Sequence, residues 1–495
     1  MPKGTEHFIS DLHGQYDAFA HFLKNGSGGI INKINDVFGD TITLAEQKSL
    51  SILVVYPEQI IEKYKKILST EDFQLFVERK LIQLIDLCKE VAHKYTKSKV
   101  RKTLPKYYAY IMEELMYEAT EDLKEYYYKS IVDKIIELDR GTNFILAFTK
   151  VIQELIIDHL HIVGDIYDRG DNASDIIDKL IEYDKVDIQW GNHDILWMGA
   201  CAGNELCITN TIRIAARYNQ LDVLTESYGI NLLPLVRLTE KYYLDDYETF
   251  YPKDTVKSER SDLIAKVHKA ISIIQFKSEH KLILRNPAFK LDSRLLLDKV
   301  NYENCTIEIN GKQHRLNSTS FPTINMKNPY KLIPEEKEML SNIKKAFMKN
   351  DRLNKHTAFL FEKGSIYKNY NGNLLIHGCI PLLEDGTFAS VEIDGKYYFG
   401  KSLLEKLEEK IRSAYFDKNL NNKDDFFVYL WQGEYSPLFG KSDMKTFERY
   451  FLNDKKLCEE SNNPYFKLRE DENILGKVFV EFDLSFSTSK IINGH

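Results

Sequence analysis

Three short apolar segments of this chain each run directly into a polar loop that contains glycine and potential metal ligands. The loops read Asp-Leu-His-Gly (11–14), Gly-Asp-Ile-Tyr-Asp-Arg-Gly (164–170) and Gly-Asn-His-Asp (191–194), after the segments 7–10, 160–163 and 186–190. Apolar residues at helical spacing follow the first two loops, at 16–23 and 172–183. The pattern predicts strands that end in functional loops, which is typical of α/β proteins.

The order of strand, helix and strand between residues 160 and 190 constrains where two of these loops lie. Such a unit predicts a right-handed parallel crossover. A parallel crossover places the loops that follow its two strands at the same carboxyl edge of one sheet, where ligands bind in open α/β folds. We therefore expect the loops at 164–170 and 191–194 to form one site.

The residue types in these loops suit metal ions. Asp11 and His13 are separated by one residue, so in an extended loop both side chains can point toward one cation. Asp165 can bridge two cations with its two oxygens, and Asn192 offers a neutral oxygen to the second. His377, at the end of a predicted hairpin strand, is the imidazole expected at that second ion. Oxygen and nitrogen donors suit Mn²⁺ and tolerate Mg²⁺, Fe²⁺ or Zn²⁺.

Taken in this order, the three loops resemble the signature of the calcineurin-like metallophosphoesterases. Within that superfamily the chain resembles the class III fructose-1,6-bisphosphatases, and the resemblance covers essentially the whole chain. It rests on the long helical segment between His13 and Asp165, on the stretch 367–386 with Ile-His-Gly-Cys-Ile-Pro at 376–381, and on the stretch 436–451.

The chain departs from that family at its C-terminus. At this point the sequences of family members contain a motif that resembles Gly-His-x-Pro, and they continue beyond it. This chain stops at Gly494 and His495. The sequence therefore resembles a member truncated at its C-terminus. The resemblance implies that His495 is the last ligand of the second metal ion.

The resemblance also implies the fold. We expect an α/β protein with a metallophosphoesterase-type αββα sandwich and a large helical insertion. The catalytic domain would be assembled from residues 1–43, 158–205 and 361–495, the last part being incomplete at its end. Residues 44–157 would form the helical insertion, and residues 206–360 a mixed accessory region.

The resemblance implies hydrolysis of D-fructose 1,6-bisphosphate to D-fructose 6-phosphate and phosphate in gluconeogenesis. Two divalent ions, with manganese the expected metal, would activate a water to the attacking hydroxide. The candidate catalytic residues are His193, Asp168, Arg169 and Asp194. Arg169 would neutralise the substrate phosphate, and His193 would protonate the leaving oxygen with Asp168 holding its protonated form. Asp194 would orient the loop.

The same residues are also compatible with simpler roles and with a different activity. Asp11, Asp165 and Asn192 are residue types that also cap strand ends and helices, and Asp194 can be a helix cap. The whole chain can be another calcineurin-like phosphatase, such as a phosphoprotein phosphatase, or a catalytically silent binding or regulatory fragment. Two cations in the stretch 436–451, Lys441 and Arg449, are further candidates for contacts with the second phosphate of the substrate, or simply face solvent.

The composition of the chain limits the classes of partner that we expect. The chain carries 74 acidic and 67 basic residues, a formal charge of −7, which argues against nucleic acid as the main partner. No apolar run is long enough to span a bilayer, so no membrane partner is expected. Six scattered cysteines without a CxxC pair fit a reducing cytoplasm. The expected partner is a small sugar bisphosphate, no cofactor is expected besides the two ions, and a homo-oligomer remains open.

Local patterns outside the three loops predict further elements. Helical periodicity dominates from 44 to 157, whereas residues 25–40 are rich in Gly and Asn and predict a loop. Hairpin turns are predicted at Asn310-Gly311, at 371–373 and at Asp394-Gly395. A β-rich run is predicted at 478–486, before a last apolar segment at 491–493.

Overall fold

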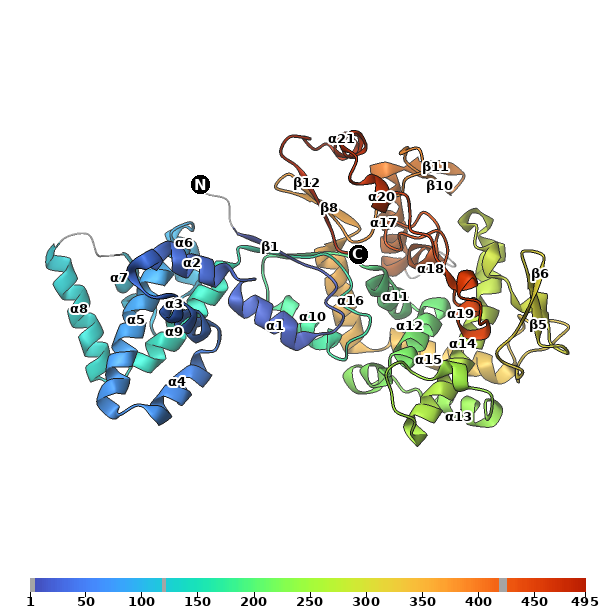
Figure 1. Cartoon of the computed structure of the whole chain (residues 1–495), viewed down its shortest axis with the longest axis horizontal. Helices are drawn as coiled ribbons and strands as arrows, with labels where there is room; N and C mark the ends of the chain where they lie inside the picture. Colours follow the sequence, from blue (N-terminus) through green and yellow to red (C-terminus); the bar gives the residue numbers. More distant parts are fainter. Residues whose placement is uncertain (1–4, 118–121, 418–424) are drawn as a thin grey trace. The chain divides into compact units, whose positions relative to one another are not determined.

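The computed structural model describes residues 5–117, 122–417 and 425–495. The chain divides into two compact units. Unit 1 contains Tyr16–His161 together with the described residues up to Phe8, and unit 2 contains Ile9–Gln15 and Ile162–His495. Figure 1 labels the helices and strands of both units.

Unit 1 is built mainly of helices (Figure 1). Its long helix α5 (Thr70–Ala92) packs against α9 (Gly141–Ile156). Val77, Leu84 and Leu87 of α5 lie at helical spacing and are buried, so the helical periodicity predicted for this region is confirmed. The other α-helices of the unit are α1 (Tyr16–Asn25), α2 (Gly29–Phe38), α3 (Leu44–Val55), α4 (Pro57–Ile67), α6 (Lys97–Thr103), α7 (Ala109–Tyr117) and α8 (Asp122–Glu137).

The loop predicted for residues 25–40 is wrong, because α2 occupies most of this segment. Ile30 and Ile34 lie one turn apart on this helix and are both buried. Their burial, and the packing of α2 against α3 and α5, outweigh the low helix propensity of the Gly and Asn residues. Tertiary contacts therefore stabilise the helical conformation of this segment.

The three predicted strands that precede the polar loops are present. β1 (Glu6–Ile9) and β2 (His159–Ile162) are neighbours in one sheet, and each ends inside unit 2. β3 (Val186–Gln189) pairs in parallel with β7 (Gly364–Ser365). The expected helix after the second loop is α10 (Ala173–Ile181), and α11 (Asn192–Cys201) begins within the third. Each polar loop therefore starts at the carboxyl end of a strand.

A second sheet in unit 2 brings two distant histidines together. β8 (Tyr367–Tyr370) and β9 (Asn373–Ile376) form the predicted hairpin, with positive φ at both turn residues, and β12 (Lys490–Asn493) pairs in parallel with β9. Asn493 lies opposite Ile376 in this register. Just beyond this pair, the backbone N–H of His495 donates to the carbonyl of His377 at 2.7 Å. The two histidines are therefore neighbours.

The other two predicted hairpins are confirmed. β5 (Thr306–Ile309) and β6 (Lys312–Arg315) meet at Asn310-Gly311, and β10 (Ser390–Ile393) and β11 (Lys396–Phe399) meet at Asp394-Gly395. All four turn residues have positive φ, as a type I′ turn requires. β4 (Val300–Asn301) adds a third strand beside β5.

Helices cover the rest of unit 2, so the chain as described mixes helices with several small sheets, in keeping with the expected α/β class. α12 (Glu205–Arg217) packs against α11 and α14 (Glu259–Arg285), and α11 packs against α18 (Asp425–Gln432). The remaining α-helices are α13 (Leu233–Tyr242), α15 (Pro334–Met348), α16 (Asp351–Lys363), α17 (Gly400–Phe416), α19 (Phe447–Phe451), α20 (Tyr465–Leu468) and α21 (Glu472–Glu481). Within the described ranges, no helix combines the length and apolarity that a bilayer crossing needs.

The β-rich run predicted at 478–486 is wrong, because helix α21 continues to Glu481. Asp471 caps this helix by accepting hydrogen bonds from the backbone N–H groups of Asn473 and Ile474. Ile474 and Val478, one turn apart, are both buried. Val and Phe suit strands and buried helix faces alike, and here the cap and the spacing favour the helix.

Candidate metal centre

The loops after β1 and β2 are tied together by backbone hydrogen bonds within unit 2. The N–H of Asp11 donates to the carbonyl of Gly164 at 3.1 Å, and the N–H of His13 donates to the carbonyl of Asp165 at 2.9 Å. Asp11, His13 and Asp165 all have positive φ, between 45° and 54°. Non-glycine residues rarely adopt this conformation, and it is concentrated at functional sites.

Asp194 fixes the loop after β3 against the loop after β2. Its carboxylate is fully buried and accepts four backbone hydrogen bonds. Oδ2 accepts from the N–H groups of Asp165 (2.9 Å) and Gly191 (2.9 Å), and Oδ1 accepts from Ile166 (3.0 Å) and Tyr167 (3.1 Å). The two loops lie side by side, as expected, and Asp194 is the side chain that positions them.

Replacing Asp194 with asparagine should therefore destabilise the protein. The amide keeps one acceptor oxygen, so two backbone donors would face its NH₂ group instead of an acceptor. The expected loss is about 2–4 kcal/mol, measured by urea unfolding at pH 8. At that pH the carboxylate is ionised, so all four backbone donors have an acceptor in the wild-type protein.

Asp471→Asn is the matched control for this change. Asp471 is an exposed N-cap, and asparagine caps a helix about as well as aspartate, so its effect should stay within about 0.5 kcal/mol. Equal losses in the two variants would contradict the positioning role of Asp194.

Two groups of potential metal ligands share one carboxylate. In the first, one ligand atom each of Asp11, His13 and Asp165 lie within 4.8 Å of one another. In the second, the same holds for Asp165, His377 and His495. Because Asp165 belongs to both groups, the arrangement matches a carboxylate that bridges two cations. Of the expected ligands, these five come together in the described structure.

The hydrogen bonding of His377 shows that its second ring nitrogen is available to an ion. Its Nδ1 lies 3.0 Å from the carbonyl oxygen of Val163, which can only accept, so Nδ1 carries the proton. Burial lowers the pKa of His377 and so favours the neutral ring, in which Nε2 presents a lone pair. This Nε2 is buried, has no hydrogen-bond partner among the described residues, and lies 3.5 Å from Oδ2 of Asp165. Two electron-rich atoms so placed are stabilised by a cation between them.

Asn192 presents a similar atom. It is the first residue of α11, and its Oδ1 is buried without a hydrogen-bond partner in the described ranges. Buried polar atoms are almost always satisfied, so an orphan oxygen next to the ligand cluster fits a metal ligand. The neighbouring Gly191 packs so closely that a Cβ there would collide with Oδ1 of Asp165.

The charges of the cluster support the same assignment. Burial and the charge of Asp168 raise the pKa of Asp165 well above its ordinary value, and burial raises that of Asp11. Burial and the neighbouring His377 lower the pKa of His495 to about 4. Carboxylates crowded beside the imidazoles of His377 and His495 favour a further positive charge nearby. The donor set of oxygens and imidazole nitrogens fits divalent ions that would supply it.

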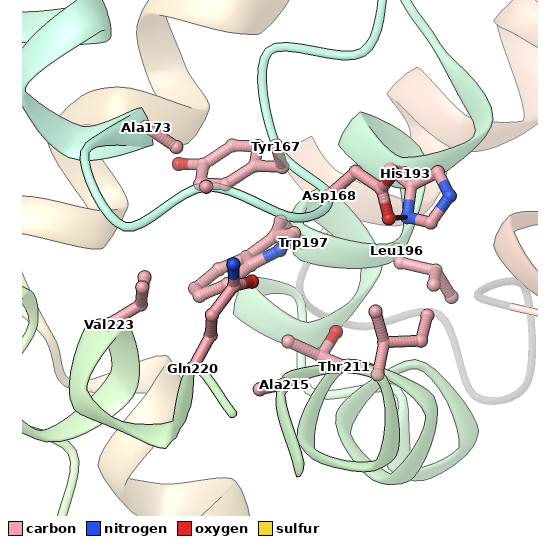
Figure 2. Close-up of a pocket in the computed structure, with 12 residues that line it drawn as sticks. Tyr167, Asp168, Ala173, His193, Leu196, Trp197, Thr211, Ala215, Gln220 and Val223 are labelled. Carbon is pink, nitrogen blue, oxygen red and sulfur yellow. Dashed lines mark ion pairs between the residues drawn. The ribbon is translucent and has the colours of Figure 1, made fainter. Parts of the chain in front are cut away.

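The candidate catalytic residues lie beside this cluster. His193 Nδ1 is 3.2 Å from Oδ1 of Asp168, an ion pair marked by a dashed line in Figure 2. The guanidinium Nε of Arg169 donates to Oδ2 of Asp168 at 2.8 Å. The N–H of His193 donates to Oδ1 of Asp165 at 3.2 Å. Burial lowers the pKa of His193 to about 4, and Asp168 opposes that shift. A bound phosphate would add further negative charge that favours the protonated ring.

Two cavities adjoin these residues. A small one of about 20 Å³ lies behind His193 and Asp168 and is lined by Tyr167 and Trp197, whose rings stack 4.5 Å apart (Figure 2). A larger one of about 360 Å³ is lined by His193 and, among others, by Asp168, Arg169, Asn192 and His495. The larger cavity therefore borders the candidate catalytic residues and two of the candidate metal ligands.

Several cations also line the larger cavity. Lys441 and Arg449, the sequence candidates for the second phosphate, both pair with Glu460, at 2.9 and 2.8 Å. Arg213 and Arg217 of α12 were not identified from the sequence. Their spacing of four residues on a helix, with one face otherwise apolar, was the available signal.

Comparisons with known proteins identify relatives of the chain. The model of a family described as Firmicute fructose-1,6-bisphosphatase matches residues 1–495. The chain is 49% identical to a class 3 fructose-1,6-bisphosphatase of Clostridium acetobutylicum and 50% identical to those of Clostridioides difficile and Fusobacterium nucleatum. Each match covers all of this chain and 76–77% of the relative. No solved structure matches the chain significantly.

Proposed function

The chain belongs to the Firmicute fructose-1,6-bisphosphatase family, and from this premise we propose that it hydrolyses D-fructose 1,6-bisphosphate to D-fructose 6-phosphate and phosphate. Within metabolism this is a step of gluconeogenesis. The observation that carries the proposal is the pair of ligand groups that share Asp165. Metal-assisted hydrolysis of phosphate esters uses such a pair of sites.

We assign the ligands to two divalent ions, with manganese as the expected metal. Asp11, His13 and Asp165 would hold the first ion, and Asp165, Asn192, His377 and His495 the second. The ions, when bound, supply Lewis acidity that activates water near neutral pH and neutralises phosphoryl charge. Val163 acts through His377, because its carbonyl fixes the tautomer that presents Nε2.

The chain's own side chains would bind the phosphate and supply the proton. Arg169 is anchored through Nε to Asp168, and its guanidinium faces the larger cavity, where it can bind phosphoryl oxygens. His193 is oriented by Asp168 at Nδ1, so Nε2 would donate the proton to the leaving sugar oxygen. The His193 ring packs against Trp431 with the two ring planes at 78° to each other, which limits its rotation.

The proposal also covers the type of sandwich fold, the partner and the cellular location. We assign the two sheets that carry the ligands to the αββα sandwich of the metallophosphoesterases. The working partner would be a small sugar bisphosphate in the cytoplasm, and the net charge of −7 is consistent with a partner other than nucleic acid.

Phosphate release tests the proposed function directly. The protein is treated with chelator, and inorganic phosphate released from fructose 1,6-bisphosphate is measured before and after Mn²⁺ is restored. We expect background rates without metal and recovery with Mn²⁺, because activation of water depends on the ions. Activity on a phosphopeptide with none on the bisphosphate would indicate a phosphoprotein phosphatase. Metal binding without activity on either substrate would indicate a silent module.

A further inference from the structure

Two arginines on α12 face the larger cavity next to the catalytic residues. Arg213 and Arg217 are one helical turn apart, and both line the cavity that His193 and Arg169 also line. Arg213 is only 5% exposed. In the part of the chain that the structure describes, neither guanidinium lies within ion-pair distance of a carboxylate, unlike Lys441 and Arg449. Two like charges are thus held side by side without compensation.

Arg213 is fixed entirely by neutral acceptors. Its Nε donates to Gln275 at 2.7 Å, one Nη donates to the hydroxyl of Tyr450 at 3.0 Å, and the other donates to Asn210 at 3.1 Å. These bonds hold the guanidinium in place but leave its charge uncancelled. A buried cation of this kind is costly unless an anion comes close to it.

Tyr450 is oriented so that it can accept from both arginines. His268 Nδ1 lies 2.8 Å from the carbonyl oxygen of Phe250, so Nδ1 is the donor and Nε2 the acceptor. The Tyr450 hydroxyl, 2.9 Å from Nε2, therefore donates to His268. Its oxygen accepts from Arg213 and, at 3.3 Å, from Arg217. The chain from Phe250 through His268 to Tyr450 thus positions Arg217.

The titratable groups around the arginines indicate a positive potential. Burial would raise the pKa of Tyr450, but Arg213 and Arg217 lower it below its ordinary value. Burial lowers the pKa of His268 to about 3, with both arginines contributing in the same direction. Tyr450 and His268 thus lie in the positive potential of Arg213 and Arg217. A positive potential of this kind attracts an anion.

Tyr218 connects this region to the catalytic arginine. The guanidinium of Arg169 lies 5.3 Å from the centre of the Tyr218 ring, and the ammonium of Lys253 lies 5.2 Å from it. The backbone N–H of Lys253 donates to the carbonyl of Arg217 at 2.9 Å, so Lys253 and Arg217 are neighbours. The ring of Tyr218 therefore lies between Arg169, which is beside the catalytic residues, and Lys253, and all three line the same cavity.

We propose that Arg217 and Lys253 bind the phosphate of the bisphosphate that is not hydrolysed, with Arg213 and Tyr450 as positioning residues. This inference rests on the proposed function and deepens it. A substrate with two phosphates needs two cationic groups in one cavity, and Arg169 with the metal ligands would form the group at the hydrolysed phosphate. A guanidinium fork and an ammonium are both common phosphate contacts.

The test compares two substrates that differ only in the second phosphate. The ratio of kcat/KM for fructose 1,6-bisphosphate to kcat/KM for fructose 1-phosphate is measured for the wild-type protein, Arg217→Gln and Lys253→Met. Loss of one charge-assisted contact should lower this ratio by about 10- to 100-fold, mainly through KM for the bisphosphate. Arg217→Lys, which keeps the charge without the fork, should recover part of it.

Arg237→Gln is the matched control, because Arg237 is an exposed arginine of α13 that does not line the cavity. Its ratio should equal that of the wild-type protein. Lys253 is exposed, so Lys253→Met keeps the test available if Arg217→Gln fails to fold. A wild-type protein active on the bisphosphate with unchanged ratios in both variants overturns the inference alone. A wild-type protein inactive on the bisphosphate overturns the inference and the proposed function together.

Discussion

Replacing Asp165 with asparagine is expected to reduce phosphate release from fructose 1,6-bisphosphate by roughly 10³-fold or more. Asp165 is the residue shared by the two ligand groups, so the change weakens both candidate metal sites at once. Metal ions supply several kcal/mol of transition-state stabilisation, and about 4 kcal/mol corresponds to that factor. The variant should also retain fewer manganese ions per chain, measured by elemental analysis after dialysis.

Asp171→Asn is the control for this prediction. Asp171 lies in the same stretch, is exposed, and belongs to neither ligand group, so the same chemical change should leave both metal content and turnover close to wild type. An Asp165→Asn protein with two bound ions and normal turnover would show that the shared carboxylate does not bridge a metal pair.

The position of the candidate site was accessible from the sequence because it is encoded locally. Each polar loop follows a short apolar strand, and parallel strands bring such loops to one sheet edge. The structure indeed ties the loop of Asp11 to that of Asp165 through backbone hydrogen bonds. His377 was also identifiable, because a hairpin with an Asn-Gly turn defines where its strand ends.

Features that depend on contacts between distant segments were not accessible in the same way. The sequence suggested that Asp194 orients its loop or caps a helix, but three of its four hydrogen bonds depend on the loop of Asp165 lying against it. Nothing local to Arg217 shows that its helix face borders a cavity, since that follows from how α12 packs on α11 and α14. The helix at Gly29–Phe38 was missed for the same reason, because burial of its isoleucines outweighs local propensity.

Replacing His193 with alanine should separate proton transfer from metal binding. His193 is next to Asn192 in the sequence, yet its ring faces Asp168 and the cavity and belongs to neither ligand group (Figure 2). We therefore expect turnover of fructose 1,6-bisphosphate to fall by roughly 10²–10⁴, the usual contribution of a general acid, while manganese content is unchanged. This combination differs from that of Asp165→Asn, in which both quantities fall.

Comparing substrates with different leaving groups tests the role of His193 more directly. An ester whose leaving group is a weakly basic phenol, such as p-nitrophenyl phosphate, needs little protonation as its P–O bond breaks, whereas a sugar alkoxide needs it fully. His193→Ala should thus lose much less activity on the phenyl ester than on fructose 1,6-bisphosphate. His314→Ala, a change at a histidine of strand β6 outside both cavities, should affect neither substrate. If His193→Ala lowered both rates by the same factor, the ring would be acting on the shared phosphoryl group, and the role of proton donor to the leaving oxygen would have to be withdrawn.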